Sequence, residues 1–205
     1  MSVNFLFKGM IIGFSIAAPV GPIGVLCIRR ALADGRAVGL ATGLGAATAD
    51  ALYGCIAGFG LTAVSAFLVG QQFWLRLVGG AFLCYLGIRT FVTRPAEQEA
   101  NVRGGSLISA YASTFFLTLT NPMTILSFVA VFAGFGLAAS PDYFAASALV
   151  IGVFLGSALW WLILSHGVGL LRSRLGPNWT QMINRLSGCI ILAFGLYALA
   201  TSFFR

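Results

Sequence analysis

Charged residues are scarce in this sequence. They occupy 8% of its 205 positions, against about 25% in soluble domains. Acidic residues are the rarest, with five Asp and Glu against twelve Lys and Arg, and there is one histidine. Hydrophobic residues fill 59% of the chain. A soluble domain is therefore excluded, and the composition predicts an all-α integral membrane protein with a single transmembrane domain over residues 1–205.

Motifs for metal binding, redox chemistry and catalysis are also lacking. The four cysteines form neither a C-x-x-C pair nor zinc-site spacing. A cation or metal exporter would need clustered His, Asp or Cys. It stays an alternative, as does a thiol redox carrier that pairs Cys27 with Cys84 or Cys55 with Cys189. Without a nucleophile–base set we expect no enzyme and no cofactor. The first apolar run lacks a basic leader, so no cleavable signal peptide is expected.

Charged and proline-containing links divide the chain into six apolar segments. A transmembrane helix needs about 20 apolar residues, and the segments cover about residues 5–28, 38–60, 73–91, 107–137, 143–168 and 181–203. The first is expected to end at Arg29-Arg30, and Pro177 is expected to lie in the last link. The sequence thus predicts six transmembrane helices.

The basic residues predict an orientation. Nine arginines flank the links after the first, third and fifth segments, whereas Lys8, Arg76 and Arg205 flank the other side. Because basic residues favour the cytoplasm, both termini are expected outside. Arg29 and Arg30 are interpreted as topology anchors, and the basic excess as a membrane signal with no nucleic-acid partner.

Three short motifs recur in the same order along the chain. GPIGVL at 21–26 is similar to NPMTIL at 121–126, ADALY at 49–53 to GSALW at 156–160, and RLVG at 76–79 to RLSG at 185–188. A repeat of three helices is odd in number, so its two copies insert in opposite senses. This indicates two inverted repeats, about 1–92 and 107–205 joined by a link at 93–106, as in many transporters.

Helices one and four carry helix-breaking prolines inside their apolar segments. Pro19, Pro22 and Pro122 each lack an N–H and clash with the carbonyl four residues earlier. Lipid cannot satisfy the freed backbone groups, so the breaks predict a substrate site between the two helices. Kinks that only serve packing are the alternative. Half-helices starting at Pro22 and Pro122 would present N–H groups, near Ile23 and Gly24 in the first, that attract a carboxylate.

Asp50 is the only charged residue between Arg36 and Arg76. At 1.5 Å per residue it falls near the membrane midplane, at the depth of Gly21 and Asn121. A carboxylate there costs at least about 2.5–3.5 kcal/mol, so a functional role is the default interpretation and structural pairing the alternative. We predict that either Asp50 or the carbonyls of Ser15 and Ala18 freed by the prolines meet a substrate ammonium group, and that Asp50 couples transport to protons.

Several other polar and aromatic residues carry weaker signals. Tyr53, one turn from Asp50, either hydrogen-bonds in the site or packs. Trp160 and Trp161 are expected to pack, with lining the pocket as the alternative. His166 is expected at the membrane interface rather than in a proton relay. The predicted substrate-binding set is Pro19, Gly21, Pro22, Ile23, Gly24, Asp50, Tyr53, Thr120, Asn121, Pro122 and Thr124.

The stretch GFSIAAPVGPIGVLCIRRAL at 13–32, the pair Ala49-Asp50 and LTNP at 119–122 resemble the LysE/RhtB family of amino-acid exporters. The likeness covers essentially the whole chain, although the first break is P-V-G-P where the family more often has P-G-P. The resemblance implies a multi-pass protein of the bacterial inner membrane that exports amino acids or close derivatives by proton antiport. Its implied partners are a small-molecule substrate, protons and membrane lipid, with homo-oligomer formation left open.

Overall fold

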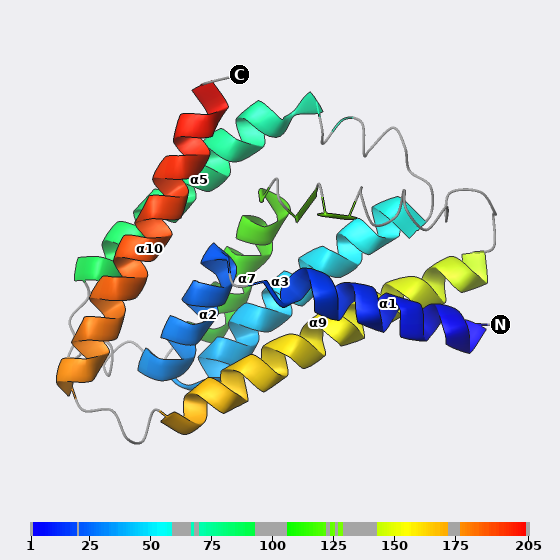
Figure 1. Cartoon of the computed structure of the whole chain (residues 1–205), viewed down its shortest axis with the longest axis horizontal. Helices are drawn as coiled ribbons and strands as arrows, with labels where there is room; N and C mark the ends of the chain where they lie inside the picture. Colours follow the sequence, from blue (N-terminus) through cyan, green and yellow to red (C-terminus); the bar gives the residue numbers. More distant parts are fainter. Residues whose placement is uncertain are drawn as a thin grey trace.

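The structure, a computed structural model, is helical wherever it describes regular structure. It describes residues 2–19, 21–58, 67, 70–92, 106–121, 124–125, 127–128, 143–171 and 177–203. The helices are α1 (Ser2–Ala17), α2 (Pro22–Ala33), α3 (Arg36–Gly58), α5 (Gln72–Val92), α7 (Ser106–Leu119), α9 (Tyr143–Leu171) and α10 (Pro177–Phe203) (Figure 1). The link at 93–105, Pro122 and the end of the fourth predicted segment lie outside the described residues.

Three of these helices, α5, α9 and α10, are long and apolar enough to cross a membrane. The pair α1–α2 adds a fourth span if its two halves cross together. α3 has 23 residues but is rich in alanine and glycine and holds Asp50, which lowers its hydropathy. α7 is a shorter apolar helix. The chain is therefore an α-helical membrane protein, and the count of six spans stays a prediction.

The first apolar segment forms two helices instead of one, as its prolines predict. α1 ends at Ala17 and α2 begins at Pro22, where a proline fits because the first N–H of a helix has no intrahelical partner. The two helix axes differ in direction by 82°. The Val25 N–H bonds the Gly21 carbonyl at 3.0 Å and closes the first turn of α2.

α2 continues past Arg29-Arg30, so the prediction that the segment ends there is wrong. The chain turns at Asp34 and Gly35 instead, whose N–H groups both bond the Arg30 carbonyl, at 2.8 and 3.0 Å. Gly35 has a φ of 110°, a left-handed conformation that glycine adopts without strain. Pro177 is likewise the first residue of α10 rather than part of a link.

Arg30 is buried among polar groups of neighbouring helices. Its guanidinium donates at 3.1 Å to Thr42 Oγ1 of α3 and, on α7, at 3.1 Å to the Ala110 carbonyl and to Thr114 Oγ1, and at 3.0 Å to Ser113 Oγ. These hydrogen bonds replace the water that the charge loses on burial, and they join α2 to two other helices.

Arg29 is buried as well and points to a different neighbour. It donates to Asn184 Oδ1 of α10 at 3.0 Å and forms an ion pair with Asp34 Oδ2 at 3.0 Å. Both side chains are buried, and each connects α2 to other helices, a structural role that the prediction of topology anchors did not include.

Glycines bring the backbones of neighbouring helices together in two helix pairs, α1 with α9 and α3 with α7. In each pair the two helices run parallel. A side chain at Gly152 or Gly156 of α9 would collide with α1, at the carbonyls of Leu6 and Met10 respectively. A side chain at Gly45 of α3 would collide with α7. Membrane helices associate through small residues of this kind, because apolar burial supplies no driving force in lipid.

α5 and α10 form an antiparallel pair of their own, side by side in Figure 1. Gly80 lies against Gly195, and Gly87 against Gly188. α3 and α9 also run antiparallel, with Gly43 against Trp161 and Gly54 near Val153 at the other end. These contacts place α2, α3 and α7 in the centre of the molecule, around the break between α1 and α2.

Candidate substrate-binding site

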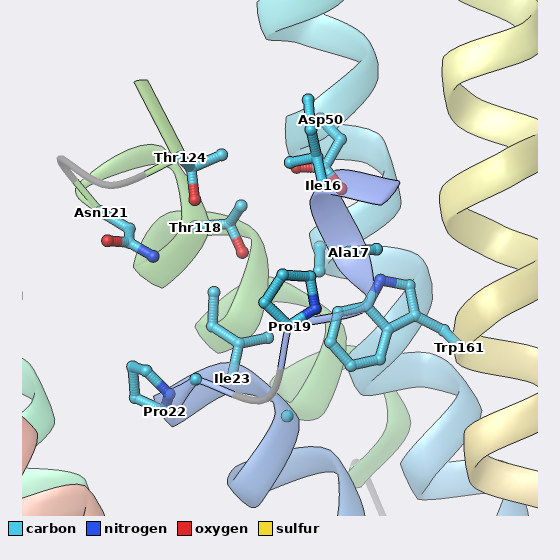
Figure 2. Close-up of a pocket in the computed structure, with 13 residues that line it drawn as sticks. Ile16, Ala17, Pro19, Pro22, Ile23, Asp50, Thr118, Asn121, Thr124 and Trp161 are labelled. Atoms are coloured by element: carbon cyan, nitrogen blue, oxygen red, sulfur yellow. The ribbon is translucent and has the colours of Figure 1, made fainter. Parts of the chain in front are cut away.

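A cavity of about 70 Å³ lies at the break between α1 and α2. On the same measure one water molecule needs roughly 10–15 Å³. Eight predicted site residues line it: Pro19, Gly21, Pro22, Ile23, Gly24, Asp50, Asn121 and Thr124. The remaining described wall is formed by Ile16, Ala17, Ala46, Thr118 and Trp161. Figure 2 shows Thr118, Asn121 and Thr124 on one side, Asp50 and Trp161 on the other, and Pro19 between them.

Two residues of the predicted set lie away from this cavity. The Tyr53 hydroxyl donates to the Leu119 carbonyl, and its ring packs on Phe128 with centroids 5.7 Å apart. The Thr120 hydroxyl donates to the Phe116 carbonyl of its own helix at 3.0 Å. Neither side chain lines the cavity. Pro122, the remaining member, lies outside the described residues.

Asp50 is held from across the helix interface. Its side chain is 3% exposed, and Ser157 Oγ of α9 donates to its Oδ2 at 2.7 Å. Trp161 Nε1 in turn donates to Ser157 Oγ at 3.1 Å. Trp161, for which packing was the favoured prediction and lining the pocket the alternative, lines the cavity and takes part in this hydrogen-bond chain.

The amino-terminal end of α2 faces the same cavity. Gly21 provides no side-chain cap, and the N–H groups of Ile23 and Gly24 have no acceptor among the described residues. Such N–H groups, together with the helix dipole, form a ready site for an anion. The cavity thus combines an anionic side chain with an anion-binding helix end.

On the fourth segment the backbone turns at the predicted place. α7 ends at Leu119, and the Asn121 carbonyl accepts from the N–H groups of Thr124 and Ile125 at 3.1 and 3.3 Å. This starts a new helical turn at Thr124, whose side chain lines the cavity. The turn brings Asn121 and Thr124 opposite Asp50 (Figure 2).

Other residues that the sequence singled out lie elsewhere. Trp160 packs edge-on against Phe14 of α1, with centroids 5.3 Å apart. His166 is exposed, and its Nδ1 lies 3.1 Å from the Leu162 carbonyl. All four cysteines are free, and the Cys27 thiol donates to the Gly39 carbonyl at 3.4 Å. Across the described ranges, no three His, Cys, Asp or Glu residues gather into a metal site.

Sequence reasoning missed Ser157, although a signal for it existed. In the repeat that aligns ADALY at 49–53 with GSALW at 156–160, Ser157 occupies the position of Asp50. The two aligned positions are in contact, because Ser157 Oγ donates to Asp50 Oδ2.

Broken apolar helices around a buried acid, with an anion-binding helix end opposite, are typical of membrane transporters. The chain belongs to the LysE type translocator family, whose model matches residues 14–202. It is therefore a transporter of small molecules and not an enzyme.

Relatives of known sequence span most of the chain. It is 29% identical over 202 residues to the "Putative amino acid efflux protein YcgF" of Bacillus subtilis, covering 95% of each protein. It is 30% identical over 175 residues to the "Uncharacterized membrane protein YahN" of Escherichia coli, covering 82% of this chain and 77% of the relative. No solved structure matches the chain.

Proposed function

We propose that this protein exports amino acids or close derivatives across the bacterial inner membrane. The observation that carries the proposal is the pair of opposite poles in one cavity, formed by the Asp50 carboxylate and the amino-terminal end of α2. A zwitterion carries the two complementary charges on neighbouring atoms. The name of the Bacillus subtilis relative, an amino acid efflux protein, supports the same substrate class.

In the proposed complex the substrate carboxylate accepts from the N–H groups of Ile23 and Gly24, and its ammonium group donates to Asp50. Asn121 and Thr124 line the opposite wall and contact the remainder of the substrate. Pro19, Gly21 and Pro22 shape the break that leaves room for these contacts. Tyr53 and Thr120 are not proposed as contacts, because their hydroxyls bond backbone carbonyls outside the cavity.

Transport is proposed to proceed by proton antiport. Asp50 is the only acidic side chain among the described cavity residues, so a proton and an ammonium group compete for it. A proton that enters from outside releases the amino acid, and the protonated carrier returns and loses its proton to the cytoplasm. Alternating access follows if one three-helix repeat rocks against the other.

We propose six spans arranged as two inverted repeats, 1–92 and 107–205. In such a repeat α1 corresponds to α7, and α3 corresponds to α9. The contact between α1 and α9 therefore corresponds to the contact between α7 and α3, and in both contacts the two helices run parallel. Gly45 and Gly152 support this exchange, since each makes close contact with the partner backbone, on α7 and α1 respectively. Both glycines precede the contact between Asp50 and Ser157 by the same number of residues. Both termini are proposed to face outward, so a reporter enzyme fused after Arg205 is expected to be active in the periplasm.

A growth challenge tests the proposed substrate class. Cells that express the protein are exposed to inhibitory concentrations of individual amino acids and toxic analogues, with empty-vector cells as the control. We expect resistance to a defined group of amino acids and no resistance to their methyl esters, which lack the carboxylate that α2 binds. Resistance to none of them, or equal resistance to the esters, would contradict the proposal.

A further inference from the structure

The hydroxyl of Ser157 donates to another helix, unlike the serine and threonine hydroxyls near it on α3, α7 and α9. Serine and threonine in helices usually donate to the carbonyl four residues earlier, and here Thr42, Thr48, Thr114, Thr118 and Ser165 all do so at 2.7–2.9 Å. Ser157 instead donates across the interface from α9 to Asp50 of α3. Its proton is therefore committed to a partner on the other repeat.

The direction of this hydrogen-bond chain follows from its members. The indole Nε1–H of Trp161 can only donate, whereas a hydroxyl has one proton and two lone pairs. Ser157 Oγ accepts from Trp161, and its own proton has Oδ2 of Asp50 as its one acceptor among the described residues. Oδ2 therefore accepts, and any proton that Asp50 carries lies on Oδ1.

The other carboxylate oxygen of Asp50, Oδ1, differs from Oδ2 because no described residue donates to it. The other cavity residues that α1, α2, α7 and α9 contribute among the described positions carry no charge. On α3 itself, the Tyr53 hydroxyl one turn away donates to the Leu119 carbonyl. Asp50 is thus a buried carboxylate that lines the cavity, with one oxygen that accepts from Ser157 and one that accepts from no described residue.

We infer that Ser157 and Trp161 are positioning residues that commit one oxygen of Asp50 and leave the other as the single atom at which a proton and an ammonium group compete. This inference rests on the proposed antiport at Asp50. With both oxygens available, a carboxyl group could hold a proton on one oxygen and accept from an ammonium on the other. Proton and substrate would then bind together, and their movements would no longer be coupled as antiport. Because Ser157 donates to Oδ2, a proton binds at Oδ1 and removes the negative charge that attracts the ammonium group, so the two ligands exclude each other.

Trp161 extends the same arrangement to the wall of the cavity. Its ring lines the cavity while its Nε1–H holds Ser157 in place. Without that N–H the Ser157 hydroxyl could turn to the carbonyl of its own helix, as its neighbours do. The positioning of Asp50 therefore depends on both residues, with Ser157 in direct contact and Trp161 one step removed.

The test uses infrared difference spectra of the full-length protein in lipid membranes during a pH titration, with protons as the only ligand. The C=O stretch of protonated Asp50, assigned by its loss in Asp50→Asn, reports the hydrogen bond at Oδ2. Ser157→Ala is expected to move this band to higher wavenumber, Trp161→Phe to move it less, and Ser157→Thr to restore it. Ser165→Ala is the matched control, since Ser165 is also fully buried on α9 but donates to the Trp161 carbonyl.

A second arm adds methylammonium, which carries the ammonium group alone. At saturation it is expected to remove the Asp50 band from the wild type and to leave part of it in Ser157→Ala. A band that Ser157→Ala does not move, that Ser165→Ala moves equally, or that methylammonium leaves unchanged in the wild type would overturn the inference. Neither arm of this test uses an amino acid. If the spectra change as expected but the protein exports no amino acid, the proposed function is wrong and the positioning role remains.

Discussion

Asp50 and Arg30 are both buried charges in the central helices, but their surroundings differ. The Arg30 guanidinium makes four hydrogen bonds to groups on α3 and α7. Asp50 accepts one hydrogen bond, from Ser157, and faces a cavity. Arg30 is not among the described residues that line this cavity. A buried charge whose hydrogen bonds go to neighbouring helices holds those helices together, whereas one that faces a cavity can bind a ligand.

The largest effect is expected when the buried charge that faces the cavity, Asp50, is removed. Asp50→Asn keeps the shape and can still accept from Ser157, but it removes the charge that a proton or an ammonium group needs. Gradient-driven export in reconstituted vesicles should fall to the level of vesicles without protein. The free energy of unfolding should change by less than about 1 kcal/mol, because the variant no longer buries a charge. Concentrative, uncoupler-sensitive export by this variant at the wild-type rate would move the coupling site elsewhere.

Arg30→Ala removes the buried charge that holds the helices together, and we expect it to lower stability more than Asp50→Asn does. The variant loses four charge-assisted hydrogen bonds and leaves a cavity, so the free energy of unfolding in mixed micelles should drop by about 3–5 kcal/mol. Arg30→Lys should lose less, because it keeps the charge but not the planar fork of donors. Arg30→Ala with unchanged stability but no export would show that Arg30 belongs to the transport site instead.

Thr42→Val tests a single contact of Arg30, because it removes one acceptor of the guanidinium at nearly constant side-chain volume. The loss should be about 1–2 kcal/mol, the order of one hydrogen bond to a charged group. Thr48→Val is the matched control, since Thr48 makes the same bond to its own helix on α3 without contacting Arg30. Equal losses in the two variants would mean that the contact between Thr42 and Arg30 contributes nothing measurable.

The smallest effect is expected at the ion pair of Arg29 and Asp34, whose side chains are 10% and 15% exposed. Asp34→Asn can still accept from Arg29, so the unfolding free energy should fall by no more than about 1 kcal/mol. Comparing unfolding at low and high salt isolates the charge, because salt screens an accessible pair. A loss as large as that of Arg30→Ala would contradict the distinction between the two arginines.

The break and much of the cavity could be predicted from sequence because their signals are local. Proline inside an apolar run marks the end of α1 at Ala17 and the start of α2 at Pro22 wherever the neighbouring helices lie. Asp50 likewise stands out by its charge alone. The eight predicted residues that line the cavity all belong to these local features or to the second break.

The parts that could not be predicted depend on how helices face one another. Trp161 and Thr118 line the cavity because of the rotation of α9 and α7 about their axes, which an apolar sequence leaves open. The contacts of Arg29 and Arg30 with other helices could not be predicted for a related reason. Their acceptors on α3, α7 and α10 are hydroxyls, an amide and a carbonyl, which no charge pattern indicates.

The glycine seam between α5 and α10 has a consequence for how the protein is made. Gly87 meets Gly188, so α5 enters the membrane well before its partner has been synthesised. At about 5–20 residues per second, the delay is roughly 5–20 seconds. During that time the glycine face of α5 contacts lipid or the insertion machinery. Assembly of this half of the molecule is therefore completed only when the last helix leaves the ribosome.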